Sequence, residues 1–390
     1  MPAMTSRQRM LAALDRQEPD HVPCSFMLYN ALRDVSTDYN DFVRRQVEMG
    51  LDAYAQIPPR PPVVAHDYVN LHGLPVSHHP SVRIEEWVEH PSDEAVPVLV
   101  KEYRTPAGTL RAEVRRTDDW PWGDHVTFLD DYLTPRSRRF PVQGPEDLAA
   151  LRCLLVPPTG SEIARFRAES QATIDLAREH DLLLAGGWGV GADLIGWVFG
   201  LEEMVFAIYD RPEFMHRLLD LIARWNRSRM EVVLDAGVDL YIKRAWYENC
   251  DFFTPSSWRE FILPILKADA DLAHERGARL GYIITSNCMP LLDMIAEAGV
   301  DVVIGVDPGE WDLEAARRTL GGRVCLWGGV SGHLTVEQGT EEEVREEVRR
   351  ALRVLGPDGF ILSPVDNVRE NSPTARANTA ALLDEWRRSW

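Results

Sequence analysis

The chain has 390 residues, of which 45% are apolar and 26% are charged. This composition is typical of a globular protein and excludes a collagen, a coiled coil or a fully disordered chain. The formal net charge of −19 argues against binding to nucleic acid or to an anionic membrane, because both require a basic surface. No apolar run approaches the roughly 20 residues that a membrane-spanning helix needs.

The beginning of the chain predicts an amphipathic helix and not a signal peptide. Met10, Leu11 and Leu14 fall on one face of this helix, behind a cap at Thr5 or Ser6. The five cysteines are an odd number and show no C-x-x-C spacing. We therefore expect reduced thiols and a cytoplasmic protein.

Short apolar runs bounded by turn residues predict eight β-strands. They lie at residues 22–27, 52–57, 182–186, 239–243, 279–284, 301–305, 323–327 and 359–363. Helical patterns separate most of the runs, with the clearest at 212–236, 255–275 and 341–355. Four glycines follow predicted helices and are expected to end them in the left-handed conformation: Gly237, Gly277, Gly299 and Gly356.

This alternation of strands and helices predicts an α/β fold with a parallel sheet. Eight strands favour a closed (β/α)8 TIM barrel. An open doubly wound sheet is the alternative, which the lack of a G-x-G-x-x-G motif after the first strand disfavours.

One stretch departs from the alternation and predicts an antiparallel β meander. Strands are expected at 82–88, 98–103 and 109–114, and the second and third form a hairpin around the turn at 106–108. We interpret residues of about 60–145 as an insertion after the second barrel strand. The whole chain, 1–390, is then a single barrel domain.

Residues at the carboxyl ends of the strands are the candidates for catalysis, because active sites of such barrels form there. Asp366 follows the eighth strand, Cys288 the fifth and Glu248 the fourth. A helix expected near Pro290 would lower the pKa of the Cys288 thiol, so Cys288 is a candidate thiolate or metal ligand. The same three residues form the candidate metal-binding set. Capping a helix or lying in a solvated loop is the structural alternative for each.

Further polar and aromatic residues at the strand ends are candidates for substrate binding. They are Tyr29, Trp188, Asp193, Lys243, Tyr247, Ser286, Asn287 and Asn367. Their aromatic rings favour a flat or apolar-bodied ligand, with core packing as the alternative. His333 is interpreted as a surface loop residue in preference to a general acid.

Several segments of the sequence resemble the uroporphyrinogen decarboxylase superfamily. The opening Ser6-Arg-Gln-Arg-Met-Leu-Ala-Ala-Leu14 is one, and Gly200-Leu-Glu-Glu-Met204 is another. The others are Arg211-Pro-Glu213, Phe261-Ile-Leu-Pro264, Gly328-Gly-Val330 with Thr335 and Gly339-Thr-Glu-Glu-Glu-Val344, and Gly359-Phe-Ile-Leu-Ser-Pro364 with Asn378. The resemblance covers nearly the whole chain and implies a (β/α)8 barrel. It implies one of two chemistries: cofactor-free decarboxylation of a tetrapyrrole, or zinc-dependent methyl transfer involving a corrinoid protein.

The sequence departs from the signature of both branches. The decarboxylase segment Arg-Gln-Ala-Gly-Arg is replaced by Tyr29-Asn-Ala-Leu-Arg33, which leaves one arginine to pair with substrate carboxylates. The methyltransferase pattern of His-x-Cys and a later Cys is replaced by Ser286-Asn-Cys288 and Asp366. A zinc site would therefore use Cys288, Asp366 and Glu248.

We expect a methyltransferase-type member that moves a methyl group from a small methylated or methoxylated substrate to a corrinoid protein. The first alternative is a cofactor-free decarboxylase or lyase that acts on a small carboxylic acid other than uroporphyrinogen. The second alternative is a non-catalytic binding protein on a barrel that has lost its ligands. The resemblance also suggests a homodimer.

Overall fold

Seven parallel strands form the main sheet of the molecule. They are β1 (Tyr54–Ile57), β6 (Leu183–Gly189), β7 (Leu240–Arg244), β8 (Arg279–Ile283), β9 (Val302–Val306), β10 (Cys325–Ser331) and β11 (Phe360–Val365). Their order in the sheet is β1-β6-β7-β8-β9-β10-β11, so each strand lies beside its successor. Strands β7, β9, β10 and β11 are buried along their whole length, as expected for a sheet covered on both faces.

The computed structural model describes residues 3–59, 74 and 76–390, and the chain divides into two compact units. The first unit comprises residues 1–60, 167–187 and 233–390, and the second comprises 61–166 and 188–232. The division into two units does not test the expectation that residues 1–390 form a single domain, which stays a prediction. Part of the predicted insertion, at residues 60–73 and 75, lies outside the described residues.

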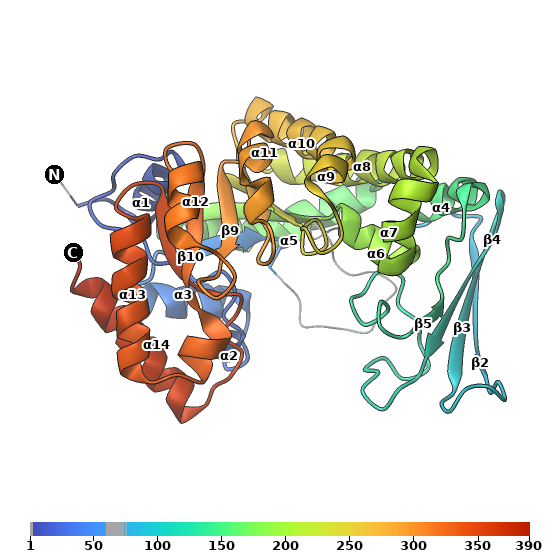
Figure 1. Cartoon of the computed structure of the whole chain (residues 1–390), viewed down its shortest axis with the longest axis horizontal. Helices are drawn as coiled ribbons and strands as arrows, with labels where there is room; N and C mark the ends of the chain where they lie inside the picture. The colour runs from blue at the N-terminus through green and yellow to red at the C-terminus, as the bar shows by residue number, and fades with distance from the viewer. Residues whose placement is uncertain (1–2, 60–73, 75) are drawn as a thin grey trace. The chain divides into compact units, whose positions relative to one another are not determined.

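Helices connect the strands of the first unit (Figure 1). They are α1 (Ser6–Leu14), α2 (Asn30–Arg33), α3 (Tyr39–Glu48), α9 (Pro255–Phe261), α10 (Leu263–Glu275), η3 (Met289–Leu291), α11 (Leu292–Glu297), α12 (Leu313–Leu320), η4 (Gly332–Glu337), α13 (Glu341–Leu355) and α14 (Pro373–Arg387). Helices α5 (Gly160–Glu179) and α8 (Pro212–Leu234) contain residues of both units. Helix α13 packs on β10 and β11, and α14 packs on α13.

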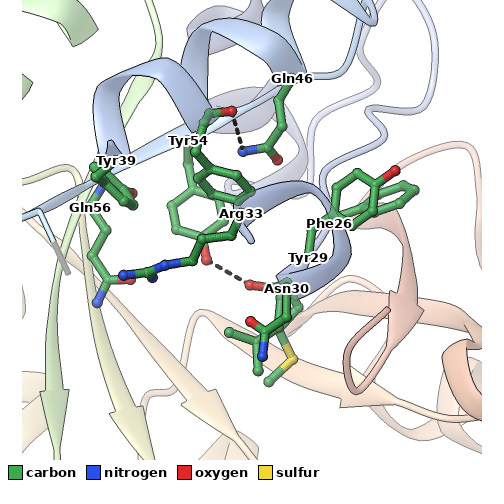
Figure 2. Close-up of a pocket in the computed structure, with 11 residues that line it drawn as sticks. Phe26, Tyr29, Asn30, Arg33, Tyr39, Gln46, Tyr54 and Gln56 are labelled. Atoms are coloured by element: carbon green, nitrogen blue, oxygen red, sulfur yellow. Dashed lines mark hydrogen bonds between the residues drawn. The ribbon is translucent and has the colours of Figure 1, made fainter. Parts of the chain in front are cut away.

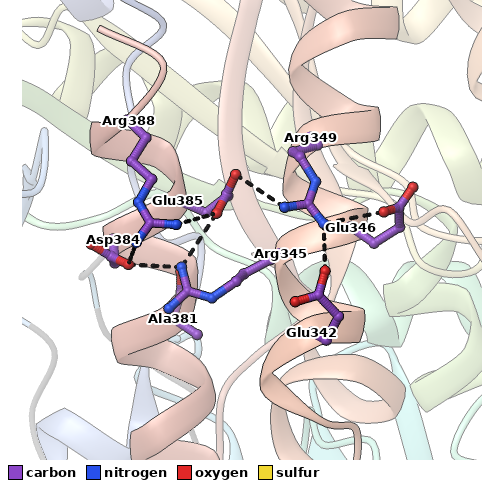
Figure 3. Close-up of polar contacts among 8 residues, drawn as sticks. All are labelled: Glu342, Arg345, Glu346, Arg349, Ala381, Asp384, Glu385 and Arg388. Atoms are coloured by element: carbon purple, nitrogen blue, oxygen red, sulfur yellow. Dashed lines mark hydrogen bonds and ion pairs between the residues drawn. The ribbon is translucent and has the colours of Figure 1, made fainter.

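Ion pairs connect α13 and α14 along their exposed sides (Figure 3). Arg345 Nη1 lies 2.8 Å from Asp384 Oδ2 and 3.3 Å from Glu385 Oε2, and Arg349 Nη1 lies 3.3 Å from Glu385 Oε1. Glu385 and Arg345 are mostly enclosed, whereas Asp384 and Arg349 remain partly solvated, so the pairs contribute modestly to the packing of α14 on α13.

The second unit contains the predicted meander, which the structure confirms. Strands β2 (Arg83–Glu89), β3 (Val98–Thr105), β4 (Gly108–Arg115) and β5 (Ser137–Arg139) form a second sheet in this order. The β2-β3 and β3-β4 pairs are antiparallel, and Thr105 pairs with Gly108 across the predicted turn. The unit also contains η2 (Pro145–Asp147), α4 (Leu148–Leu154), α6 (Ala192–Val198) and α7 (Leu201–Asp210).

The predicted first strand at 22–27 is wrong as a strand. Only Cys24 forms a bridge, parallel to Leu362 of β11. Ser25 N–H donates to the Leu362 carbonyl on one side, and the Cys24 carbonyl accepts from Asp52 N–H on the other. The α/β fold with a curled parallel sheet is confirmed, whereas closure into an eight-stranded barrel stays a prediction.

The predicted helix ends agree with the structure except at Gly356. Thr5 caps α1 and forms a capping box with Gln8. Gly237, Gly277 and Gly299 have φ values of 78°, 74° and 85°. Gly356 has φ −83° and ψ −177°, because the following Pro357 favours an extended conformation at the residue before it.

No helix in the described part of the chain is long and apolar enough to cross a membrane.

Candidate active site

Three charged residues from different strands lie at the carboxyl edge of the parallel sheet. Arg244 ends β7, Asp307 follows β9 and Asp366 follows β11. Asp366 is exposed at this edge; the protein around its carboxyl group raises its pKa by desolvation, and the negative charge of Asp307 adds to this effect. Arg369 and Arg244 act in the opposite direction and lower it, so both guanidinium groups lie within electrostatic reach of Asp366. The net direction is a raised pKa.

Asp307 has a raised pKa for the same main reason. Burial raises it, and Glu310 adds to this, although the Asp307 carboxylate accepts a hydrogen bond from Gly309 N–H at 2.9 Å. The sheet edge therefore presents two carboxyl groups whose surroundings favour the neutral form. Such a pair is suited to proton transfer.

Lys243 and Arg244 are adjacent in β7, and their side chains point to opposite faces of the sheet. Lys243 Nζ lies 2.7 Å from Asp269 Oδ2 of α10, and both side chains are 1% exposed. Successive residues of a strand point to opposite faces. Arg244 therefore leaves the helix-covered face, and its guanidinium lies 4.1 Å from the ring centre of Trp246. The structure thus places the predicted substrate-binding Lys243 in a buried ion pair.

The loop that carries Asp366 is tied to the segment before α2. Asn367 Oδ1 accepts a hydrogen bond from Asn30 N–H at 3.1 Å, and the Val368 carbonyl accepts one from Ala31 N–H at 2.9 Å. Asn367 was expected to bind substrate, and here its side chain holds the start of α2. These bonds tie the loop that follows Asp366 to Asn30, one of the residues that line a pocket.

This pocket lies between the segment 26–33, α3 and the end of β1 (Figure 2). Its enclosed part has room for about one water molecule, and the rest of the hollow is open to solvent. Its lining residues are Phe26, Met27, Leu28, Tyr29, Asn30, Arg33, Tyr39, Phe42, Gln46, Tyr54 and Gln56. Among these described residues Arg33 is the one that carries a charge.

The tyrosine hydroxyls of the pocket are engaged within the protein. Tyr54 Oη donates to the Met27 carbonyl at 2.8 Å, and Tyr39 Oη accepts from Gln56 N–H at 2.7 Å. Burial raises the pKa of Tyr29, a predicted substrate-binding residue. The Arg33 guanidinium lies 5.9 Å from the centre of the Tyr39 ring. Aromatic rings and one cation therefore dominate the lining, which favours an aromatic or flat anionic ligand.

The loops after β7 and β8 are connected by three hydrogen bonds. Ser286 Oγ accepts from Asn249 Nδ2 at 3.0 Å, and Asn287 Nδ2 donates to Asp251 Oδ1 at 2.7 Å. Cys250 N–H donates to the Asn287 carbonyl at 2.9 Å. Both predicted substrate-binding side chains, Ser286 and Asn287, thus connect the two loops.

Cys288 does not have the thiolate character expected of it. Its side chain is buried, and burial raises the pKa of the thiol, with a further contribution from Cys250. The element after it is the three-residue η3, and a full helix begins only at Leu292. The expected helix N-terminus is therefore too distant and too short to lower the pKa.

The residues predicted to hold zinc do not fit that role together. Glu248 is 1% exposed, and its Oε2 accepts a hydrogen bond from the Tyr282 hydroxyl at 2.5 Å. The Cys288 thiol is buried, and burial raises its pKa. Within residues 3–59, 74 and 76–390, no three His, Cys, Asp or Glu side chains are grouped so that they could hold a metal ion.

The other predicted site residues are spread over both units. The Tyr247 ring packs edge-on against Phe252, with ring centres 5.6 Å apart. Trp188 and the buried Asp193 belong to the second unit, so their part in the site stays a prediction. His333 is half-exposed, and its Nδ1 lies 3.0 Å from Glu337 Oε2.

Two residues of the edge, Arg244 and Asp307, were not singled out from the sequence. The signal for Arg244 was available, since Lys243 and Arg244 end one apolar run and only one of them can point to each face. Asp307 follows the sixth predicted strand and carries no motif of its own. Its proximity to Asp366 depends on the order of strands in the sheet.

Comparisons with known proteins agree with this fold. A family model described as "Uroporphyrinogen decarboxylase (URO-D)" matches residues 127–387. The uroporphyrinogen decarboxylase of Chlorobium luteolum is 31% identical over 162 residues, which are 40% of this chain and 44% of that protein. That of Hydrogenovibrio crunogenus is 28% identical over 215 residues, 52% and 58% of the two chains. The matched regions thus span about half the length of these relatives.

Among solved structures, a methyltransferase from Methanosarcina mazei has a similar fold. The TM-score is 0.60 at 17% sequence identity, and the match covers 99% of both chains. At this identity the similarity concerns the fold alone.

Proposed function

Because the chain belongs to the uroporphyrinogen decarboxylase family, we propose that it is an enzyme that removes carbon dioxide from a small carboxylic acid without a cofactor. The observation that carries the proposal is the placement of Asp366 at the carboxyl edge of the sheet, within electrostatic reach of Arg244 and Arg369. In its protonated form a carboxyl group at this position can act as a general acid.

The proposed architecture around this edge is the (β/α)8 barrel. The segment around Cys24 supports it, because this segment is hydrogen-bonded to Leu362 of β11 and to Asp52, which precedes β1. In a closed barrel the carboxyl ends of all strands surround one mouth, and Arg244, Asp307 and Asp366 would face each other across it.

In the proposed reaction, the bond between the carboxylate and its neighbouring carbon breaks and carbon dioxide leaves. The bonding electron pair stays on the substrate carbon, which then takes the proton of Asp366. The guanidinium of Arg244 stabilises the negative charge that develops on the substrate. Asp366 regains its proton from water. One carboxylate and one proton thus yield one carbon dioxide and one product that is shorter by one carbon atom.

We infer the substrate class from the hollow that residues 26–33 line, to which Asn367 is hydrogen-bonded. Its aromatic lining suits a flat ring, and Arg33 suits an anionic substituent on that ring. A tetrapyrrole with many carboxylates fits this site poorly, because Arg33 is the one charged residue among the described lining residues. The net charge of −19 also disfavours a polyanion.

A second candidate function is methyl transfer to a corrinoid protein. It is supported by the similarity to the Methanosarcina mazei methyltransferase over 99% of both chains. Asp366 would then protonate the heteroatom that loses its methyl group. We rank it second because the candidate zinc ligands do not form a group, and because decarboxylation uses only groups of this chain.

The proposal is tested with carboxylic acids that carry ¹³C in the carboxyl group, in aromatic, heteroaromatic and aliphatic series. Released ¹³CO₂ is measured by mass spectrometry for the wild type, Asp366→Asn and the exposed control Asp118→Asn. We expect release from at least one aromatic acid, a loss of about 100-fold or more in Asp366→Asn, and no change in the control.

A parallel arm offers methoxylated acids together with cob(I)alamin and follows methylcobalamin by absorbance. Methyl transfer without carbon dioxide release would replace the first function by the second. Carbon dioxide release that is equal in the wild type and in Asp366→Asn would contradict the assignment of the general acid.

A further inference from the structure

Glu337 uses its buried carboxylate to hold the loop that carries Asp366. Glu337 is the last residue of the π-helical segment η4, and it is 4% exposed. Its Oε1 accepts hydrogen bonds from the backbone N–H groups of Arg369, at 2.5 Å, and Glu370, at 3.1 Å. One oxygen of a buried carboxylate is thus bound to two consecutive peptide groups, three and four residues after Asp366.

The second oxygen of the same carboxylate is bound to side chains. Glu337 Oε2 lies 3.0 Å from Nδ1 of His333 and 3.7 Å from Nη2 of Arg369. The bonds from His333 and from the two peptide groups outweigh burial and lower the pKa of Glu337, so the group is ionised. Charge-assisted bonds of this kind are stronger than neutral ones, and they require a carboxylate at this position.

Arg369 connects Glu337 to the proposed general acid. Its backbone and its guanidinium both contact Glu337, and its positive charge lowers the pKa of Asp366. The other charged groups that act on Asp366 are Arg244, from β7, and Asp307, after β9. Glu337 therefore restrains the backbone of Arg369 and compensates part of its charge, and the Arg369 guanidinium also lies 3.2 Å from His333 Nδ1.

Helix α14 is hydrogen-bonded to the segment that carries Glu337. Asn378 of α14 donates from Nδ2 to the carbonyls of Val336, at 3.0 Å, and Gly339, at 2.7 Å. These carbonyls lie at the irregular end of η4, where a regular helix would leave them without partners. The support for Glu337 is thus built from the last helix of the chain.

We propose that Glu337 is a positioning residue, which acts on the reaction through Asp366 by fixing the backbone and the guanidinium of Arg369. The inference rests on the proposed function only for the role of Asp366 in the reaction. The effect of Glu337 on the proton affinity of Asp366 can be measured without any substrate.

The experiment compares the wild type with Glu337→Gln, Glu337→Asp and the exposed control Glu341→Gln. The protein is labelled with ¹³C at the aspartate side-chain carboxyl carbons, and the Asp366 signal is assigned from its loss in Asp366→Asn. Glu337→Gln removes a negative charge that compensates Arg369, so we expect the titration midpoint of Asp366 to fall by about half a pH unit or more. The control should not move it.

Activity supplies the second readout once a substrate is found. A general acid works in its protonated form, so the alkaline fall of kcat should move to lower pH in Glu337→Gln, with KM unchanged. Glu337→Asp keeps the charge and should restore the midpoint at least in part. A purely structural role would lower activity equally at all pH values and would leave the midpoint unchanged.

The two proposals fail in different ways. If no acid is decarboxylated but the midpoint falls in Glu337→Gln, the proposed function is wrong and the effect of Glu337 on Asp366 stands. If carbon dioxide is released and Glu337→Gln changes neither the midpoint nor the pH profile, the inference about Glu337 is wrong.

Discussion

Two neighbouring residues of β7 place their positive charges in regions of very different character. Lys243 forms an ion pair of 2.7 Å with Asp269 of α10, and both side chains are fully enclosed. Arg244 lies at the carboxyl edge, near an Asp366 whose pKa stays raised despite two nearby guanidinium groups. The first region contains an ion pair that is closed to solvent, whereas the second contains two carboxyl groups with raised pKa values.

This difference separates a structural region from a reactive one within a single strand. A fully paired charge has one stable protonation state and does little besides holding β7 to α10. At the edge, burial and the neighbouring Asp307 oppose ionisation of Asp366, while Arg244 and Arg369 favour it. A carboxyl group under opposed influences of this kind is a candidate for proton exchange during a reaction.

The largest expected effect concerns the paired region. Asp269→Ala leaves the Lys243 ammonium buried without its carboxylate, which should lower the free energy of unfolding by about 3–5 kcal/mol. Chemical denaturation measures this loss, and Asp366→Asn is the matched control at the edge, with little expected change. The double variant Lys243→Met/Asp269→Leu removes both charges and should recover most of the stability. A loss in Asp269→Ala below about 1 kcal/mol would show that the pair is not fully desolvated.

A second buried lysine, Lys101, lies in β3 of the other unit, and its ion pair with Glu86 is longer than that of Lys243 with Asp269. Its Nζ donates to the Val126 carbonyl at 2.6 Å, and Glu86 Oε1 lies farther away, at 3.3 Å. Burial lowers the pKa of Lys101 to about 7, from an ordinary value of 10.5. Between these two values the unfolded chain holds a proton that the folded chain has released. The free energy of unfolding should therefore rise with pH in this window, by up to about 1.4 kcal/mol per pH unit.

Lys101→Met is the variant that isolates this contribution. Methionine fills a similar volume without a charge, so the rise between pH 7 and pH 10 should become smaller than in the wild type. Thermal unfolding at several pH values measures the difference. Equal slopes in both proteins would mean that Lys101 stays protonated over the whole range.

The sequence predicted the fold well where local signals agree with the final structure. The meander was found from alternating residues and the turn at 106–108, because register in such strands follows from the sequence itself. The segment 22–27 was misjudged, because an apolar run of this length is compatible with a buried strand or with a buried extended segment. Only the pairing with Leu362, far away in sequence, decides between them.

The candidate site was predicted at the level of loops and less well at the level of atoms. The rule of carboxyl ends selected Asp366 and Tyr29 as site residues, and Tyr29 lines a pocket, whereas the roles of both stay predictions. It could not show that Lys243 points away, or that Glu248 is bound by Tyr282. The pKa of Cys288 depends on its burial, which spacing along the chain does not reveal.

The smallest expected effect returns to Arg244 and completes the comparison with Lys243. Arg244→Met keeps the stem of the side chain against Trp246 and removes a charge that lowers the pKa of Asp366. The titration midpoint of Asp366 should therefore rise, opposite to the fall expected for Glu337→Gln. In the proposed reaction kcat should drop about 10-fold, because the developing negative charge loses its partner. The ¹³C titration and a pH profile of kcat measure both changes. Shifts of the same sign in Arg244→Met and Glu337→Gln would mean that general loosening of the sheet edge, and not the sign of the missing charge, controls the proton on Asp366.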